Sequence, residues 1–409
     1  MRALLSFLGL NAHWLAAGFL LTFASSFGQT FFISIFAGEI RGVFGLSNGQ
    51  WGGIYTLATT ASAATMVWMG GLADRFRARA LGVAVLFGLA AATLAMAAVP
   101  NVWALVVVIF LLRLTGQGMT TQVAMVAIAR WFAASRGRAL SVATLGVATG
   151  EAFLPLSFVA LMGVFDWRWL WGIATVIVLA LVPVLMGLLR TERTPQSLAS
   201  GARRSPGLFG RDWTRGEVLR HWLFWLMVPT LLGPAMFNTA FFFHQVHFAA
   251  TKGWDHVALV ALFPFYSMFN VGAMIASGWA VDRFGSGRIT SVFLLPMAAG
   301  YLLLAQAPSP ATAWPGLVLM GVTTGTAATI SAAFWAEFYG TRHLGAIRAT
   351  TTAVMVFGTA LGPGITGALI DFGIEFRDQL PAIAGYLAAA SALAWIGVAR
   401  ARRFLPRPA

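Results

Sequence analysis

Long apolar stretches separated by short polar ones run along the whole chain. Six lie in the first half and six in the second, and they cover residues 13–37, 50–72, 80–98, 102–129, 139–163, 168–190, 221–249, 255–280, 288–307, 312–338, 346–371 and 380–400. Each can cross a hydrocarbon core of about 30 Å, which takes about 20 helical residues. The pattern predicts an all-α membrane protein with twelve transmembrane helices.

The second half repeats the first at an offset of 208 residues. Gly-Gly-Leu-Ala-Asp-Arg-Phe at 70–76 returns as Gly-Trp-Ala-Val-Asp-Arg-Phe at 278–284, and His13-Trp14-Leu15 returns as His221-Trp222-Leu223. Matched Asp, Arg, His and Trp are hard to obtain by chance in so apolar a chain. The chain is therefore expected to contain two copies of one unit.

The repeat also predicts the organisation of the molecule. Each copy holds an even number of spans, so both copies have the same orientation and are related by a pseudo-twofold axis along the membrane normal. We expect a six-helix bundle at 1–190, a second at 221–409, and between them a polar cytoplasmic linker at 191–220 whose Thr214 and Glu217 can cap a short helix.

The charge balance fits a membrane protein rather than a nucleic-acid-binding one. The 409 residues are 59% hydrophobic and 10% charged, with a net charge of +14. Most of the basic residues fall in the segments on one side of the predicted spans, which by the positive-inside rule places both termini in the cytoplasm. We expect a monomer in the cell (inner) membrane, with its first apolar run retained and no nucleic-acid partner. Zero cysteines exclude disulfides and Cys-ligated metals.

The repeated loop resembles the Gly-x-x-x-Asp-Arg-x-Gly-Arg-Arg/Lys loop of the major facilitator superfamily. In the first copy Arg77 stands where Gly is usual, and in the second the last basic residue is displaced to Arg288. The resemblance implies a transporter that works by alternating access, in which the two loops form a conformational latch on the cytoplasmic side. The matching latch residues are Gly70, Asp74, Arg75, Arg79, Gly278, Asp282 and Arg283.

Two charged residues fall within the predicted spans. Arg113 and Gln117 in span four resemble a pattern of the same superfamily, and Glu151 follows Gly150 in span five. A rise of 1.5 Å per residue puts Arg113 and Glu151 at nearly the same depth on sequential antiparallel helices. We predict that they are coupled electrostatically, directly or through water. The coupling either changes with proton or anion binding or is a permanent structural ion pair.

Other polar side chains within the spans are candidates for a substrate and proton-coupling site, or for hydrogen bonds between helices. They are Gln29 with Ser25, Ser26, Thr30 and Ser34 in span one, Asn238, His244 and Gln245 in span seven, and Tyr266 and Asn270 in span eight. Ser26, Thr30 and Ser34 share one helical face by their spacing of four. His244 and His247 are three residues apart, but without a third ligand we expect no metal site and no cofactor.

The segments at 129–140 and 27–32 are similar to the bacterial monocarboxylate and oxalate/formate porters. That resemblance implies transport of a small organic anion, commonly with a proton. In that branch a basic residue in span eight or eleven usually holds the anion, and these spans lack one here. Either Arg113 binds the anion, or the substrate is neutral or amphipathic. An exporter that works by proton antiport is the alternative, although such exporters usually carry Pro where Glu151 stands.

Two further classes differ from a transporter. A membrane-embedded transferase would use His244, His247 or Glu151, and a sensor would keep the fold without transporting. The sequence contains no metalloprotease helix, nucleophile elbow or phosphate loop. We therefore expect a secondary active transporter and not an enzyme.

Overall fold

The computed structural model describes residues 7–132, 135–191 and 206–405, and the described part is helical without strands. In the first half the helices are α2 (Ala12–Ala24), η1 (Ser25–Gly28), α3 (Thr30–Ile33), η2 (Ser34–Phe36), α4 (Ala37–Phe44), α5 (Asn48–Met69), α6 (Leu72–Arg75), α7 (Ala78–Ala97), α8 (Val102–Leu112), η3 (Arg113–Thr120), α9 (Thr121–Trp131), α10 (Arg136–Met162) and α11 (Trp167–Leu188).

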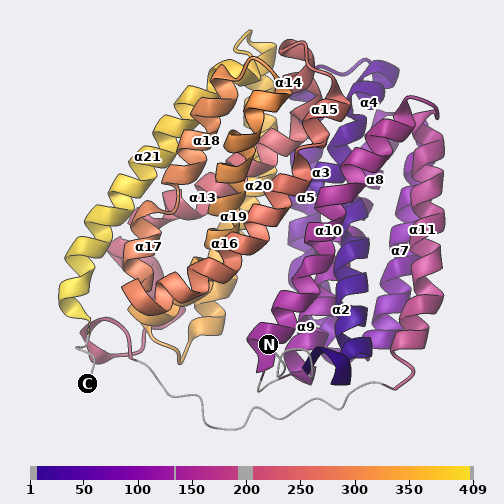
Figure 1. The fold of residues 1–409 in the computed structure, drawn as a ribbon. Helices are drawn as coiled ribbons and strands as arrows, with labels where there is room; N and C mark the ends of the chain where they lie inside the picture. The colour runs from indigo at the N-terminus through magenta and orange to yellow at the C-terminus, as the bar shows by residue number, and fades with distance from the viewer. Residues whose placement is uncertain (1–6, 133–134, 192–205, 406–409) are drawn as a thin grey trace. The chain divides into compact units, whose positions relative to one another are not determined.

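The second half continues with short surface helices and six long spans (Figure 1). These are η5 (Leu208–Gly210), α12 (Arg215–Arg220), α13 (Trp222–Phe243), α14 (Gln245–Thr251), α15 (His256–Val260), α16 (Phe263–Phe284), α17 (Ser286–Val292), α18 (Leu295–Gln306), α19 (Pro310–Tyr339), α20 (Leu344–Asp371), α21 (Phe376–Ala401) and η6 (Arg402–Phe404).

The helices form two compact units. One consists of Met1–Ser47 and Gly53–Gly201, and the other of Asn48–Gly52 and Ala202–Ala409. In the first unit α7 packs against α11, and α2 packs against α9 and α10. In the second, α16 packs against α19, α13 against α20, and α18 against α21. The predicted linker limits stay a prediction, because 192–205 lie outside the described residues.

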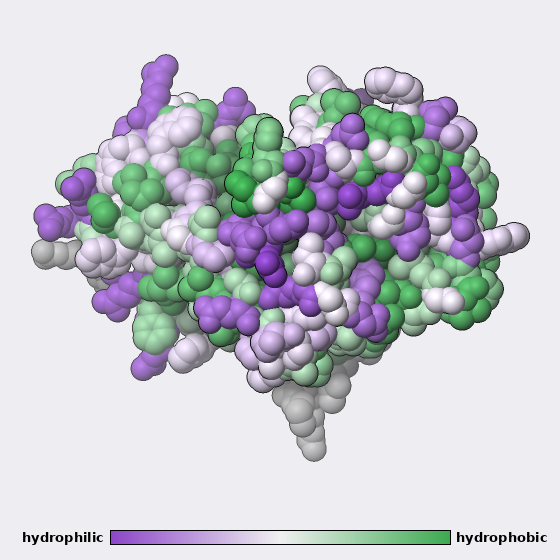
Figure 2. All heavy atoms as spheres, turned by 90° about the horizontal axis from the view of Figure 1, so that it is seen from above, coloured by the Kyte–Doolittle hydropathy of each residue, from purple (hydrophilic) through white to green (hydrophobic). Residues whose placement is uncertain are grey.

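The described elements account for the predicted spans in order. Ten helices are long and apolar enough to cross a membrane, and the bent pair Ala12–Gly28 and Thr30–Phe44 makes eleven. The remaining span corresponds to α5, which has 22 residues rich in Gly, Ala and Thr. Many large apolar side chains along these helices are exposed, such as Trp103 at 81% and Trp68 at 76%, as expected for surfaces that face lipid. Hydrophilic side chains stand among hydrophobic ones at the helix ends (Figure 2).

The first span is broken where the sequence predicted a continuous helix. Gln29 is extended, with φ −85° and ψ 154°, and the two halves of the span meet at 47°. The expected common face of Ser26, Thr30 and Ser34 is therefore wrong, because the break falls between Ser26 and the other two. Broken helices occur inside membrane proteins where the backbone is buried in protein or lines a cavity.

Two other local features follow short-range rules. Gly146 and Gly150 of α10 lie against Phe19 and Ser26 of the first span so closely that a side chain at either position would overlap them. Small residues spaced by four thus let these two helices cross closely. Helix α12 begins with the predicted capping box, in which Thr214 and Glu217 exchange hydrogen bonds.

Candidate functional site

Arg113 lies at the break in the first span. Its Nη1 donates to the carbonyl oxygen of Gly28 at 3.2 Å and to Thr30 Oγ1 at 3.4 Å. The carbonyl belongs to the last residue of η1, directly before the extended Gln29. A buried carbonyl that loses its helical partner needs another donor. The guanidinium of Arg113 is this donor. The contact therefore stabilises both the buried charge and the broken first span.

The surroundings of Arg113 are closed and partly polar. The residue is only 1% exposed, and its guanidinium lies 5.2 Å from the ring centre of Tyr55. The Tyr55 hydroxyl is 2.5 Å from Thr30 Oγ1, so Thr30 connects the two side chains. Arg113 Nε is buried and has no hydrogen-bond partner within the described residues. The guanidinium therefore keeps a donor available for a further acceptor.

Arg113 also begins an unusual segment of span four. Residues Arg113–Thr120 form a π-helical turn between α8 and α9, and this turn packs against η1. Such turns are rare and occur often at functional sites. Gln117 lies within the turn and Gln29 at the facing break, and both side chains are half-buried. The structure thus brings together Gln29, Arg113 and Gln117, three of the residues that the sequence singled out.

Glu151 is not a direct partner of Arg113 in this structure. The described contacts of the Arg113 side chain go to Gly28, Thr30 and Tyr55. Glu151 lies half-buried on α10 and has interactions of its own. A direct ion pair is therefore absent from the described contacts of Arg113, because the guanidinium is used by the broken first span instead. Coupling of the two charges through water stays a prediction.

A second polar group lies in the other unit. The Tyr266 hydroxyl lies 3.2 Å from Asn238 Oδ1 and 3.1 Å from Thr324 Oγ1. Both oxygens are within reach of its single O–H donor. Tyr266 is fully buried, so its hydroxyl needs such partners. These contacts join α13, α16 and α19. Asn238 and Tyr266 were predicted candidates, whereas Thr324 was missed because a threonine in a membrane helix gives no distinctive signal.

The second unit has no counterpart of the Arg113 charge. At the repeat offset Arg113 corresponds to Gly321 and Gln117 to Gly325. A side-chain carbon at 321 would lie 2.5 Å from the Tyr266 carbonyl oxygen, and one at 325 would overlap the carbonyl oxygen of Asn270. Helices α16 and α19 therefore cross at these glycines. These two positions carry polar side chains in the first unit, and their glycines allow close helix packing in the second.

The two histidines of span seven have separate partners. His244 is 2% exposed, and its Nε2 lies 3.3 Å from the carbonyl oxygen of Pro363. His247 Nε2 lies 2.7 Å from Glu375 Oε2, at the start of α21. Within the described residues no three His, Cys, Asp or Glu side chains gather as metal ligands would. In the described contacts the two histidines thus bond to different helices, His244 to α20 and His247 to the start of α21.

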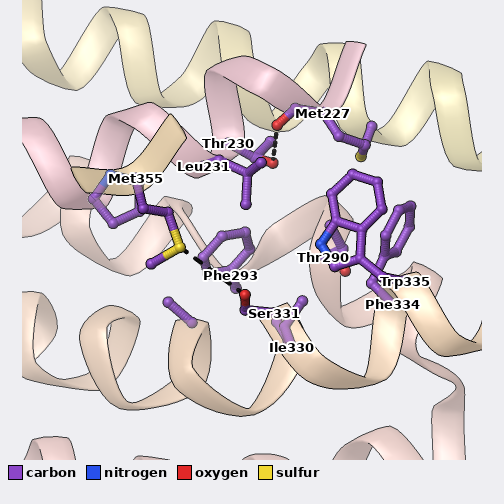
Figure 3. A pocket seen from close by; sticks show the side chains of 12 residues that line it. Met227, Thr230, Leu231, Thr290, Phe293, Ile330, Ser331, Phe334, Trp335 and Met355 are labelled. Atoms are coloured by element: carbon purple, nitrogen blue, oxygen red, sulfur yellow. Dashed lines mark hydrogen bonds between the residues drawn. The ribbon is translucent and has the colours of Figure 1, made fainter. Parts of the chain in front are cut away.

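An apolar pocket lies inside the second unit, between α13, α17, α19 and α20 (Figure 3). Aromatic rings and thioethers dominate its wall, with Trp335, Phe334, Phe293, Met227 and Met355 prominent in the view. Thr230, Thr290 and Ser331 add hydroxyl groups, but Thr230 already donates to the Met227 carbonyl oxygen and Thr290 to that of Ser286. The pocket suits an apolar group rather than a charge.

The two predicted latch loops differ in their local contacts. In the first, Arg130 donates to the Ala73 carbonyl oxygen at 3.1 Å, whereas the Asp74 side chain lies outside the described residues. In the second, the guanidinium of Arg283 lies 5.9 Å from the ring centre of Trp279. A side chain at Gly278 would meet nothing within 4 Å in the described structure. No close helix approach is therefore seen at Gly278 in the described contacts.

Tyr55 is the functional candidate that sequence reasoning missed. It is fully buried, and both its hydroxyl and its ring face the Arg113 group. It is also the one tyrosine of the first 265 residues. A lone phenol in an apolar span needs a polar partner, and that signal was available from the sequence.

Known proteins resemble the chain over most of its length. A family model described as Major Facilitator Superfamily matches residues 18–363. Monocarboxylate transporter 13 of Bos taurus is 27% identical over 289 residues, which are 69% of this chain and 64% of that protein. A Multidrug resistance protein B homolog of Mycobacterium tuberculosis is 29% identical over 126 residues, covering 31% of this chain and 23% of that protein. The chain thus matches less than two thirds of either relative.

Solved structures share the fold at low sequence identity. A bacterial homologue of the human lysosomal transporter Spinster, in an inward-facing and occupied conformation, has a TM-score of 0.76 and 16% identity, with 98% of this chain and 99% of that one covered. The nucleoside transporter NupG has a TM-score of 0.68 and 14% identity, with 94% and 99% covered. These likenesses confirm the predicted fold class. The family match over residues 18–363 shows that the chain belongs to the Major Facilitator Superfamily.

Proposed function

We propose that the protein moves a small organic anion, a monocarboxylate, across the inner membrane together with a proton. The observation that carries this proposal is the buried Arg113 guanidinium. Its described hydrogen bonds go to one carbonyl oxygen and one hydroxyl, both neutral groups, so no described hydrogen bond of Arg113 compensates its positive charge with an anion. A buried cation of this kind is costly unless an anion or water reaches it.

A carboxylate fits the donors around Arg113. A guanidinium binds carboxylates through paired N–H groups, and Arg113 Nε has no described partner. Gln29 and Gln117 lie on the two segments that meet at Arg113, and each amide offers two more donors. The likeness to a monocarboxylate transporter supports the same substrate class.

Glu151 is the group that we assign to proton coupling. It is the acidic residue of the membrane-spanning part of α10, the helix that crosses the first span at Gly146 and Gly150. Protonation would remove its charge from the low-dielectric region near Arg113 and so change the affinity for a substrate anion. Neutral Glu151→Gln should therefore transport with little dependence on an imposed pH gradient. A gradient dependence equal to that of wild type would exclude this role.

Uptake into proteoliposomes tests the substrate class. The purified protein should accumulate radiolabelled small monocarboxylates, and more so when the outside is acidic. Neutral aromatic compounds of similar size serve as the comparison. If these accumulate and the carboxylates do not, the alternative holds, namely transport of neutral or amphipathic compounds by proton antiport. The apolar pocket around Trp335 and the partial likeness to a multidrug resistance protein favour that second candidate.

Cross-linking of the two Asp-Arg loops tests separately whether they form a cytoplasmic latch during alternating access. The chain contains no cysteine, so Phe76→Cys and Phe284→Cys place one thiol beside each of the two Asp-Arg loops. A bifunctional reagent that bridges them should stop uptake, and each single variant treated in the same way should remain active. Full uptake after verified bridging would remove the latch role from these loops. The same labelling, with an impermeant reagent, checks that both loops lie on the cytoplasmic side.

A further inference from the structure

The first unit has a basic pocket at the membrane end of two spans, remote in sequence from the Arg113 group. It lies where α7 begins and α11 ends, and its empty space is about 750 Å³ including the part open to the outside. Arg77, Arg79 and Arg190 line it, together with Ala80, Val83, Met186 and Leu189. Three arginines thus line the space, and no carboxylate is among the described residues that line it.

Two of the three arginines, Arg77 and Arg190, have no described partner for their guanidinium groups, whereas Arg79 has interactions of its own. The side chains of Arg77 and Arg190 are exposed and form no ion pair or hydrogen bond among the described residues. Arg77 is also the N-cap residue of α7, and an arginine cannot accept hydrogen bonds from a helix N-terminus. An anion placed here would meet the positive end of α7 in addition to the arginines.

The other wall of the pocket is apolar and continues along the spans. Met186 is 41% exposed; Leu179, two turns before it on α11, is 41% exposed, and Phe87, one turn after Val83 on α7, is 53% exposed. Helices α7 and α11 pack against each other, so these side chains border one groove. A ligand with an anionic head and an apolar tail would place its head against the arginines and its tail along the apolar groove. A free ion would contact only the arginines.

The second unit repeats the pocket with fewer arginines. Ala80, Val83 and Arg190 correspond by the repeat offset to Arg288, Ser291 and Val398, which line a pocket where α17 begins and α21 ends. There Glu337 of α19 already accepts hydrogen bonds from the backbone N–H and the hydroxyl of Ser286, at the start of α17. The first unit has Ala129 at the position of Glu337. At this position the second unit therefore supplies a carboxylate where the first unit has only a methyl group.

We propose that the pocket between α7 and α11 binds the phosphate group of an anionic phospholipid, with the acyl chains lying along the groove beyond it. Basic pockets between transmembrane helices at the cytoplasmic level are suited to such headgroups. Arg77 and Arg190 hold the phosphate from the two sides, and Val83 and Met186 contact the start of the chains. The site is independent of the transported substrate.

Native mass spectrometry of the purified full-length protein tests this proposal. The protein is titrated with phosphatidylglycerol, with phosphatidylcholine of the same acyl chains, and with inorganic phosphate. We expect one phosphatidylglycerol to bind more tightly than phosphatidylcholine. The double variant Arg77→Gln/Arg190→Gln should bind it about 30-fold more weakly, since each arginine near an anionic headgroup contributes about 1 kcal/mol and 1.4 kcal/mol is a factor of ten.

Two further variants keep the result interpretable. Arg215→Gln/Arg403→Gln removes the same charge from positions outside both pockets and should bind phosphatidylglycerol as wild type does. Ala80→Asp places a carboxylate in the pocket and should also abolish selective binding, without removing any arginine. Equal phosphatidylglycerol affinity in wild type, Arg77→Gln/Arg190→Gln and Ala80→Asp would overturn the site. Binding of inorganic phosphate with no preference for phosphatidylglycerol would overturn the assignment to lipid.

Discussion

Arg113 Nη1 lies 3.2 Å from the carbonyl oxygen of Gly28. The buried arginine of span four thus donates a hydrogen bond to the last residue of η1, where span one breaks. This contact joins a charge to a backbone irregularity. Each would be unfavourable alone in a membrane, since a lone charge lacks an acceptor and a broken helix lacks a donor. Together they form a polar group that is held rigidly by two packed segments.

Removing the guanidinium should damage both folding and transport. Arg113→Met leaves the Gly28 carbonyl without its donor, which we expect to cost about 1–3 kcal/mol of stability, and it should abolish carboxylate uptake. Arg113→Lys keeps the charge but not the fork of donors, so it should be more stable than Arg113→Met and still transport poorly. Thermal melting in detergent and proteoliposome uptake measure the two effects. Arg41→Met, at the end of α4, is the control; if Arg113→Met matched it in both assays, Arg113 would have neither role.

The Tyr55 hydroxyl should influence substrate affinity more than the fold. Tyr55→Phe removes one of the two described partners of Thr30 Oγ1, the other being Arg113, and keeps the ring beside Arg113. A hydrogen bond contributes about 1 kcal/mol, so KM should rise about fivefold. Tyr301→Phe is the matched control, because the buried Tyr301 hydroxyl has no hydrogen-bond partner within the described residues. Equal KM values for the two variants would contradict a role of Tyr55 at the site.

The crossing of α16 and α19 should not tolerate a side chain at Gly325. Gly325→Ala places a methyl group on the Asn270 carbonyl oxygen, and overpacking of this kind costs about 1–3 kcal/mol. We expect a lower melting temperature and a lower yield of monodisperse protein. Gly385→Ala on the exposed side of α21 meets nothing within 4 Å and should be neutral. A Gly325→Ala protein as stable as Gly385→Ala would show that the two helices do not need this contact.

Acid should weaken the start of span α13 through His221. The ring lies next to Trp213, and its Nδ1 is 3.0 Å from the Tyr339 hydroxyl. Burial, and then the positive charge of Arg211, lower the pKa of His221 below its ordinary 6.5. The folded protein binds a proton at His221 less readily than the unfolded chain does. The stability that the neutral His221 ring contributes is therefore fully present above pH 6.5 and is lost as the pH falls through the lowered pKa of the folded state.

Melting temperatures recorded across the range in which histidines titrate would measure this effect. His221→Gln should show a smaller drop at acid pH than wild type. His13→Gln changes the repeat counterpart of His221 and should keep the wild-type drop. If His221→Gln and wild type lost stability equally on acidification, another group would be responsible.

Much of this architecture could be predicted because it depends on patterns that are local in sequence. Apolar run lengths predicted the spans, and the repeated Asp-Arg loop indicated the family. Capping by Thr214 and Glu217 also follows a short-range rule. These features were confirmed because few arrangements satisfy backbone hydrogen bonds in a membrane.

The site was less predictable because it depends on tertiary choices. Depth along the helices placed Arg113 and Glu151 at one level, but depth does not fix the direction of a side chain. The guanidinium contacts the Gly28 carbonyl, which became available only because the chain breaks at Gln29. Gln29 itself carries no Pro or Gly signal for such a break. Tyr55, by contrast, could have been found by asking what partner a lone phenol has in an apolar span.

The replacement of Arg113 and Gln117 by Gly321 and Gly325 has an evolutionary consequence. The second copy has a tight helix crossing at these positions and the first copy has polar groups there, so substitution of the polar groups leaves the crossing of α16 and α19 unchanged. Substitutions in the first copy alone can then change which substrates the protein accepts. An artificial chain built from two second copies should still assemble its helices, yet it would have no buried guanidinium to select what it carries.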